Sequence, residues 1–225
     1  MSRIFVPSKG PDDWRPLLAD PEKHWETKHS ARTLAHCWED AAGFPPEVLK
    51  VLSRNPILAT AEPLLIFPEW KVPLPGGSRS SQNDIWLLAK TAAGLVSIAV
   101  EGKVEEPFGP NVGEWKHEAS TGKDKRLAWL TDVLSLSAPI PDPIRYQLLH
   151  RAASAVMEAE RFGAQHAAML VHSFSKNNSG FGDFAAFAGL FSLSAVPDQL
   201  LSTSMPNGLP LHLAWIRGDM RFLNA

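Results

Sequence analysis

Residues 83–103, which read NDIWLLAKTAAGLVSIAVEGK, decide the fold of this chain. Two apolar runs flank the short segment Thr91–Gly94, a pattern typical of a β-hairpin. With the turn at Ala92 and Ala93, the pairing places Asp84 directly opposite Glu101. A turn one residue longer would shift this pairing by one position. The hairpin therefore brings two acidic residues to one place on the sheet.

Opposed residues of a hairpin lie on the same face, with Cβ atoms about 5 Å apart. Two carboxylates in such a pair repel each other unless a cation lies between them. Lys103 projects from the same face because it follows Glu101 by two residues. Alternatively, Asp84 caps the strand end, and Glu101 and Lys103 are surface charges. A covered face favours a site, and apolar or small residues share this one: Trp86, Leu88, Ser97 and Ala99.

The chain has 225 residues, of which 44% are hydrophobic and 20% are charged, and its net charge is −2. This composition predicts a globular protein, and the near-neutral charge provides no overall attraction to nucleic acid. The single cysteine, Cys37, excludes an internal disulfide and fits a reducing cytoplasm. The N-terminus lacks a signal-peptide pattern, and the apolar stretch around Leu95–Val100 is too short to span a bilayer. We expect a cytoplasmic protein without a membrane partner.

Residues 1–30 are polar and rich in proline, a composition that predicts an irregular N-terminal arm. Residues 31–225 predict a single α/β domain. We expect helices over about 31–41 after a Ser30 cap, 46–53, 125–136, 143–162 after an Asp142 cap, and 183–191. We expect strands over 63–75, the two hairpin runs, 167–174 and 209–216. This order predicts a mixed central sheet that contains the antiparallel hairpin and is flanked by helices on both faces.

The residues Asp84 and Glu101-Gly102-Lys103 resemble the motif of the PD-(D/E)xK nuclease superfamily, which has the restriction-endonuclease-like fold. The core of that fold is a helix, three antiparallel strands, a helix and a strand. Its acid lies on the second strand and its E-x-K on the third. The resemblance covers about residues 31–175, and Asn83 replaces the proline that commonly precedes the aspartate. The segment VEGKVEEPFGP also resembles uncharacterised bacterial proteins assigned to this superfamily.

The resemblance implies a role for each motif residue. Asp84 and Glu101 would hold Mg²⁺ or Mn²⁺, with the backbone carbonyl of Gly102 as a further ligand. Lys103 would orient the attacking water or balance charge in the transition state. Many relatives add an acid from the first helix, for which Glu39 is the candidate and Glu47 the reserve. Glu39 could equally be a solvated helix residue.

Four further residues are candidates for contacts to nucleic acid. Gln147 occupies the helix after E-x-K, where some exonuclease-like relatives carry a glutamine. Arg151 follows it by four residues on the same helical stripe. Arg79 and Ser81 precede Asp84 and could bind a backbone phosphate. An exposed helix face and an ordinary turn explain these residues equally well.

Other catalytic patterns are missing from the sequence, which has no H-E-x-x-H, C-x-x-C, G-x-S-x-G or Walker motif. His36 and Cys37 are neighbours and do not face each other on a helix, so Cys37 is expected in the core. His172 lies in an apolar strand and is expected to be a hydrogen-bonded core histidine. The sequence predicts a magnesium-dependent hydrolase that acts on nucleic acid, with DNA as the expected partner. The alternative is a binding or regulatory protein that keeps the nuclease fold. The sequence leaves open whether the protein forms a homo-oligomer.

Overall fold

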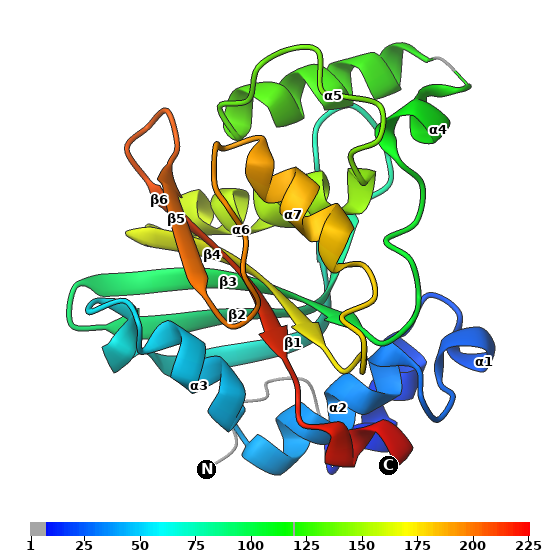
Figure 1. Ribbon diagram of the computed structural model, residues 1–225, viewed down its shortest axis with the longest axis vertical. Coiled ribbons are helices and arrows are strands. Elements are labelled where there is room, and N and C mark those ends of the chain that lie inside the picture. The colour runs from blue at the N-terminus through cyan, green and yellow to red at the C-terminus, as the bar shows by residue number, and fades with distance from the viewer. Residues whose placement is uncertain (1–7, 119) are drawn as a thin grey trace.

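The structure, a computed structural model, describes residues 8–118 and 120–225. The first seven residues of the predicted arm lie outside the described residues. One mixed sheet of six strands runs through the centre in the order β1-β2-β3-β4-β6-β5 (Figure 1). Its strands are β1 (Glu62–Val72), β2 (Ser81–Thr91), β3 (Gly94–Lys103), β4 (His166–Ser173), β5 (Leu200–Ser204) and β6 (Pro210–Arg217).

The β2–β3 hairpin has the predicted register. Its ladder runs from Thr91 opposite Gly94 to Ile85 opposite Val100, around a two-residue turn. Gly94 has a φ of 126°, a conformation that favours glycine at this turn. One step beyond the last pair, Asp84 and Glu101 follow on the two strands. The predicted antiparallel hairpin is therefore confirmed within a mixed sheet.

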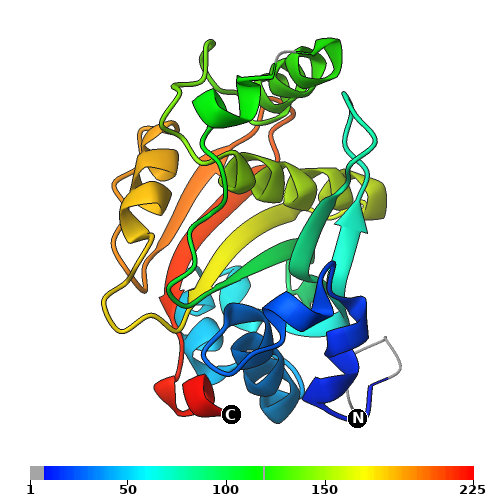
Figure 2. The ribbon, with the colours of Figure 1, turned by 90° about the vertical axis from the view of Figure 1, so that its right-hand side faces the viewer.

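Helices cover both faces of the sheet (Figure 2). Trp38 and Val48 pack with Ile85 and Val100 on one face, and Leu149 and Ala152 pack with Ala99 on the other. The first face carries η1 (Pro11–Leu17), α1 (Pro21–His24), α2 (Ser30–Ala41), α3 (Pro46–Leu52), η2 (Leu58–Thr60) and η3 (Met220–Asn224). The second carries α4 (Val112–Lys116), α5 (Thr121–Val133), α6 (Tyr146–Phe162) and α7 (Phe181–Gly189). The predicted mixed α/β architecture is thus confirmed.

Residues of the N-terminal arm take part in the hydrophobic core on the face of the sheet that carries α2 and α3. Trp14 and Trp25 are buried there among side chains of α2, including Leu34. The arm contains η1 and α1, so it holds two short helical segments rather than only irregular chain. It packs against α2 and, through η1, against β1.

One predicted helix start is wrong. α6 begins at Tyr146, not at Pro143. The carbonyls of Asp142 and Ile144 accept hydrogen bonds from the amides of Gly113 and Val112, so they do not start a helical ladder. The prediction also omits strand β5, whose sequence LLSTS is short and half polar. Ser30 lies inside α2, and His29 occupies the N-cap position.

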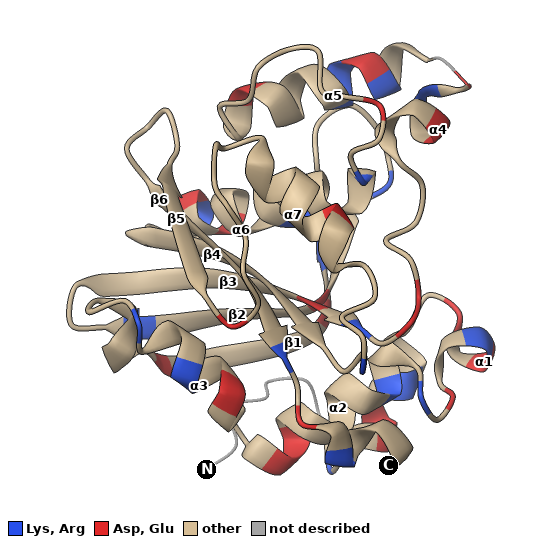
Figure 3. Cartoon of the chain, in the orientation of Figure 1, with Lys and Arg blue, Asp and Glu red and all other residues tan. Residues whose placement is uncertain are grey.

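Charged residues of both signs are spread over the helices α1, α3 and α5 (Figure 3). Within the described residues, no helix is both long enough and apolar enough to cross a membrane.

Candidate active site

A cleft of about 500 Å³ opens between the N-terminal arm, the strands β1–β3 and the start of α6. All three predicted catalytic residues line it. The polar side chains at its centre are Glu69, Asp84, Glu101, Lys103, Gln147 and Arg151. The hairpin thus brings the expected constellation together in one place that a ligand can reach.

Glu101 is buried and fully engaged by the chain's own donors. Its Oε1 accepts hydrogen bonds from Lys103 Nζ at 2.8 Å and Gln147 Nε2 at 2.7 Å. Its Oε2 accepts one from Arg151 Nε at 2.6 Å. Burial alone would raise the pKa of Glu101, but Arg151 and Lys103 outweigh it and lower that pKa. Glu101 is therefore an ionised carboxylate at neutral pH.

Asp84 shares Arg151 with Glu101 but is less well compensated. Its Oδ2 accepts a hydrogen bond from the Gly102 amide at 2.7 Å, and its Oδ1 lies 3.8 Å from Arg151 Nη2. Burial, followed by the charge of Glu101, raises the pKa of Asp84 to about 7. The two acids of the predicted pair thus repel each other, as their opposed placement requires.

Lys103 is held in a partly aromatic environment. Its Nζ bonds Glu101 and lies 4.7 Å from the centre of the Phe108 ring. The side chain is only 6% exposed, yet it reaches the cleft. Lys103 is therefore a fixed cation beside both acids.

Glu69 is a cleft residue that the sequence analysis missed. It lies between two β1–β2 pairs, Pro68 with Ile85 and Trp70 with Asn83, which sets it opposite Asp84. Its φ of 53° is uncommon for a residue other than glycine. Gln82 Nε2 donates to its Oε2 at 2.7 Å, and burial, followed by Asp84, raises the pKa of Glu69 to about 8.

The cleft's donor set fits a hard divalent cation. Glu69, Asp84 and Glu101 offer carboxylate oxygens, which Mg²⁺ and Mn²⁺ prefer. Lys103 and Arg151 balance only two of the three negative charges. Burial is the larger cause of the raised pKa of Asp84 and of Glu69, and the charge of a neighbouring acid adds to it. A bound dication would balance the remaining negative charge.

The structure assigns two predicted nucleic-acid contacts to the interior instead. Arg151 is buried, and besides Glu101 it donates from Nη1 to Ser81 Oγ at 3.2 Å. Ser81 is buried too, and its Oγ lies 2.8 Å from His150 Nδ1. These contacts dock α6 onto β2 and position Arg151 against the acids. The prediction that Ser81 binds a phosphate is wrong because its hydroxyl is already engaged inside the protein.

The remaining two candidates for nucleic-acid binding differ in position. Gln147 lines the cleft and is half-buried. Arg79 is exposed and lies outside the cleft lining. Its carbonyl accepts a hydrogen bond from Arg126 Nη2 at 3.1 Å, one of several that fix the loop before β2.

Neither acid proposed from the first helices reaches the cleft. Glu39 accepts hydrogen bonds from Trp14 Nε1 at 2.7 Å and Ser8 Oγ at 2.5 Å, so it fastens the N-terminal arm to α2. Glu47 starts α3 on the sheet face opposite α6 and bonds His172. The expectation that either residue completes the metal site is wrong, since their carboxylates serve other partners.

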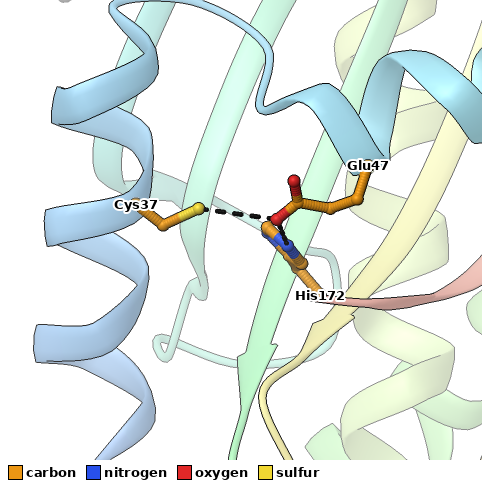
Figure 4. Close-up of side chains that lie close together, drawn as sticks. All are labelled: Cys37, Glu47 and His172. Atoms are coloured by element: carbon orange, nitrogen blue, oxygen red, sulfur yellow. Dashed lines mark hydrogen bonds and ion pairs between the residues drawn. The ribbon is translucent and has the colours of Figure 1, made fainter. Parts of the chain in front are cut away.

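Glu47 belongs to a second polar cluster with Cys37 and His172 (Figure 4). Their potential ligand atoms lie within 4.8 Å of one another. Glu47 Oε1 lies 3.7 Å from Cys37 Sγ and 3.0 Å from His172 Nε2. The Asp219 amide donates to the same oxygen at 3.2 Å. The cluster joins α2, α3, β4 and the turn before η3.

The protonation of this second cluster opposes metal binding. Trp38 Nε1 donates to His172 Nδ1 at 3.2 Å, so the imidazole proton lies on Nε2 and points at Glu47. A metal on Nε2 would need that proton removed. Burial, followed by Glu47, raises the pKa of Cys37, which keeps the thiol protonated. Cys37 and His172 are core residues, as predicted.

Comparison with known proteins identifies a family. The family described as Domain of unknown function (DUF6946) matches residues 7–220. No curated protein and no solved structure matches the chain significantly.

Proposed function

This chain belongs to the DUF6946 family, and we propose that it is a metal-dependent nuclease that hydrolyses phosphodiester bonds in nucleic acid, with DNA as the expected substrate. One observation carries the proposal. Asp84, Glu101 and Lys103, which the sequence motif relates to phosphodiester chemistry, line the same open cleft. The proposal includes the PD-(D/E)xK superfamily as the relationship that the motif suggests.

The order of the elements supports this relationship. α2 precedes three antiparallel strands, β1–β3, which are followed by α6 and then by β4, parallel to β3. The acid Asp84 lies on the second strand, and Glu101 and Lys103 lie on the third. This is the arrangement that the resemblance leads us to expect.

The residues that would hold Mg²⁺ or Mn²⁺ are Asp84, Glu101, the Gly102 carbonyl and Glu69. Glu69 takes the place that the sequence analysis gave to Glu39. When bound, the ion would polarise the phosphate and lower the pKa of a bound water. Glu69 reaches the cleft from β1, next to the strand that carries Asp84, so three adjacent strands would contribute to one site.

The chain's own residues would perform the remaining tasks. Lys103 is a fixed cation at the cleft wall, so it would donate a hydrogen bond to a phosphate oxygen as negative charge develops. Arg151 keeps Glu101 ionised and holds Asp84 beside it. Gln147 fixes Glu101 Oε1 from α6. Because these partners are rigidly placed, the carboxylates are preorganised before a substrate arrives.

A second function, a binding or regulatory protein, is favoured by one observation. Both Glu101 oxygens already accept hydrogen bonds from Lys103, Gln147 and Arg151. A cleft whose acid is neutralised internally could bind a ligand without metal or chemistry.

A metal titration with a nuclease assay tests the proposal. Calorimetry with Mg²⁺ and Mn²⁺ should show binding to the wild type and to Glu39→Gln, but not to Asp84→Asn. Labelled single- and double-stranded DNA and RNA should be hydrolysed by the same two proteins that bind metal. Metal binding that survives Asp84→Asn would overturn the proposal. Nucleic-acid binding without hydrolysis at any metal concentration would favour the second function.

A further inference from the structure

The cleft offers little positive charge to a polyanion. Four acids line it, Glu69, Asp84, Glu101 and Glu106, against two permanent cations, Lys103 and Arg151. One bound divalent ion would bring this set only to neutrality. Proteins that follow a nucleic-acid backbone instead neutralise many phosphates with lysine and arginine. The charge of this cleft therefore suits a ligand that presents one phosphodiester.

Several cations in and beside the cleft are already paired with acids. Lys103 and Arg151 both bond Glu101 inside it. Outside it, Lys116 pairs with Asp142 at 2.8 Å, and Arg145 pairs with Asp183 at 2.9 Å. On the helices the two signs of charge alternate rather than forming a basic stripe (Figure 3). These paired side chains are therefore not free to follow a long phosphate backbone.

The walls of the cleft match a ligand the size of a nucleotide. Its volume of about 500 Å³ lies within the range of about 300–1,000 Å³ common for small-molecule sites. The arm contributes the rings of His24 and His29, and α6 contributes those of Tyr146 and His150. Tyr146 is buried and packed between Trp115 at 4.0 Å and His150 at 4.9 Å, so the rings most open to a ligand are those of the arm. Such rings can stack on any nucleobase.

We infer that the cleft takes a single phosphodiester together with a flanking nucleoside, and that it rejects the interior of a duplex. The inference rests on the proposed function for the role of the acids and Lys103. Two sources could supply this chemistry, a dinucleotide or the free end of a single strand. In both, one phosphate meets the acids while the nucleoside lies against the rings of the arm and of α6.

A binding experiment with a non-hydrolysable probe tests the inference. The probe is a fluorescent dithymidine in which both bridging oxygens of the phosphate are replaced by CH₂, bound to wild-type protein with Mn²⁺. Anisotropy should show binding with a salt slope of about −0.7, the value for one neutralised phosphate. A steeper slope, or no binding of the probe, would overturn the inference.

Competitors then separate the sources and exclude the duplex. A linear single strand should displace the probe about tenfold better than a circular strand of the same sequence. Preference for the dinucleotide over both strands would identify the small ligand as the source. Displacement by a closed circular duplex as strong as that by the linear strand would contradict the inference.

A matched pair of variants tests the wall formed by the arm. His24→Ala removes a ring that lines the cleft, and we expect about threefold or greater weakening of probe binding. Lys23→Ala changes the exposed neighbour, which lies outside the lining, and should leave binding unchanged. Equal effects of the two variants would show that the arm does not contact the ligand.

The two proposals fail in different ways. If no substrate is hydrolysed, the nuclease function is lost, but the probe and its competitors still decide what the cleft binds. If a closed circular duplex is hydrolysed as fast as a linear single strand, the nuclease function stands and the inference about the ligand falls.

Discussion

Two clusters built around carboxylates lie on opposite faces of the same sheet. The cleft cluster consists of Glu69, Asp84, Glu101, Lys103 and Arg151, and it faces α6. The closed cluster consists of Cys37, Glu47 and His172, and it is packed under α2 and α3. Their strands are in direct register, since Gly102 pairs with His172. Neighbouring strands therefore place Glu101 and Lys103 of β3 in the cleft cluster and His172 of β4 in the closed cluster.

The clusters differ in how their charge is satisfied. In the closed cluster, burial opposes ionisation, but hydrogen bonds from His172 and from the Asp219 amide lower the pKa of Glu47 to about 2. In the cleft cluster, the pKa of Asp84 is raised to about 7 and that of Glu69 to about 8. Excess charge held next to an open cleft is typical of a functional site, whereas a fully satisfied polar group is typical of a structural one.

The largest expected difference between the clusters is in hydrolysis. Asp84→Asn should reduce the rate of phosphodiester hydrolysis by about 10²–10³-fold or more, since it removes a carboxylate ligand of the proposed metal ion. Glu47→Gln makes the same carboxylate-to-amide change in the closed cluster and should leave the rate within about twofold of the wild-type rate. A nuclease assay at saturating Mn²⁺ compares the two. Equal losses would break the distinction between the clusters.

The next effect is on the stability of the cleft cluster. Arg151→Met leaves Glu101 buried with one cation fewer and Asp84 without its nearby guanidinium. We expect a loss of about 3 kcal/mol in the free energy of unfolding, measured by urea denaturation. The control is Arg217→Met, whose pair with Asp198 is 61% exposed on the arginine side. That variant should change the free energy by less than about 1 kcal/mol.

A smaller effect is expected in the closed cluster. Glu47→Ala leaves the His172 Nε2–H and the Asp219 amide without their acceptor. The expected cost is about 1–3 kcal/mol in unfolding free energy, without a change in metal affinity. Urea denaturation and calorimetry measure the two quantities. A loss of metal binding in this variant would mean that the closed cluster holds the ion.

The pH dependence of stability should have opposite signs for the two clusters. The pKa of Asp84 is higher in the folded protein than its ordinary value of 3.8, so the folded state binds more protons between about pH 4 and 7. Metal-free wild type should therefore lose stability as the pH rises through this range, relative to Asp84→Asn. The pKa of Glu47 is lowered, so its contribution is present above about pH 4.5 and is lost as the pH falls through about 2.

Unfolding measured in EDTA at a series of pH values checks both signs. The difference between wild type and Asp84→Asn isolates the cleft, and the difference between wild type and Glu47→Gln isolates the closed cluster. A cleft contribution that grows with rising pH would show that Asp84 is well compensated without metal.

The sequence predicts the central hairpin because its register follows from a local turn. Apolar runs on both sides of Ala92 and Ala93 leave few ways to pair, and so Asp84 and Glu101 could be placed together. Glu69 could not be found in this way. The prolines and the bulge of β1 make the register of this strand hard to predict from the sequence. The backbone at Glu69 also has a positive φ, which the amino-acid composition does not predict.

Other misses have a different physical origin. The sequence suggests Arg151 as a nucleic-acid contact because it follows Gln147 on one helical stripe, and Ser81 because it precedes Asp84. In the structure Arg151 donates hydrogen bonds to Glu101 and to Ser81. These contacts become apparent only from the packing of α6 on β2. The predicted helix start at Asp142-Pro143 is wrong because the carbonyls of Asp142 and Ile144 accept from Gly113 and Val112, which are distant in sequence. Glu39 was chosen from a family pattern, and its true partner, Trp14, comes from the arm.

The two buried tryptophans of the arm have a practical consequence for anyone who shortens the protein. Trp14 and Trp25 fill the interior beside Leu34, while the neighbouring His24 and His29 border the cleft. A version that starts at residue 31 would lose both of these tryptophans together with the two histidines that border the cleft. Its inactivity would say nothing about recognition, because a collapsed core would produce the same result. Single substitutions on the outward side of the arm are therefore more informative than a truncation.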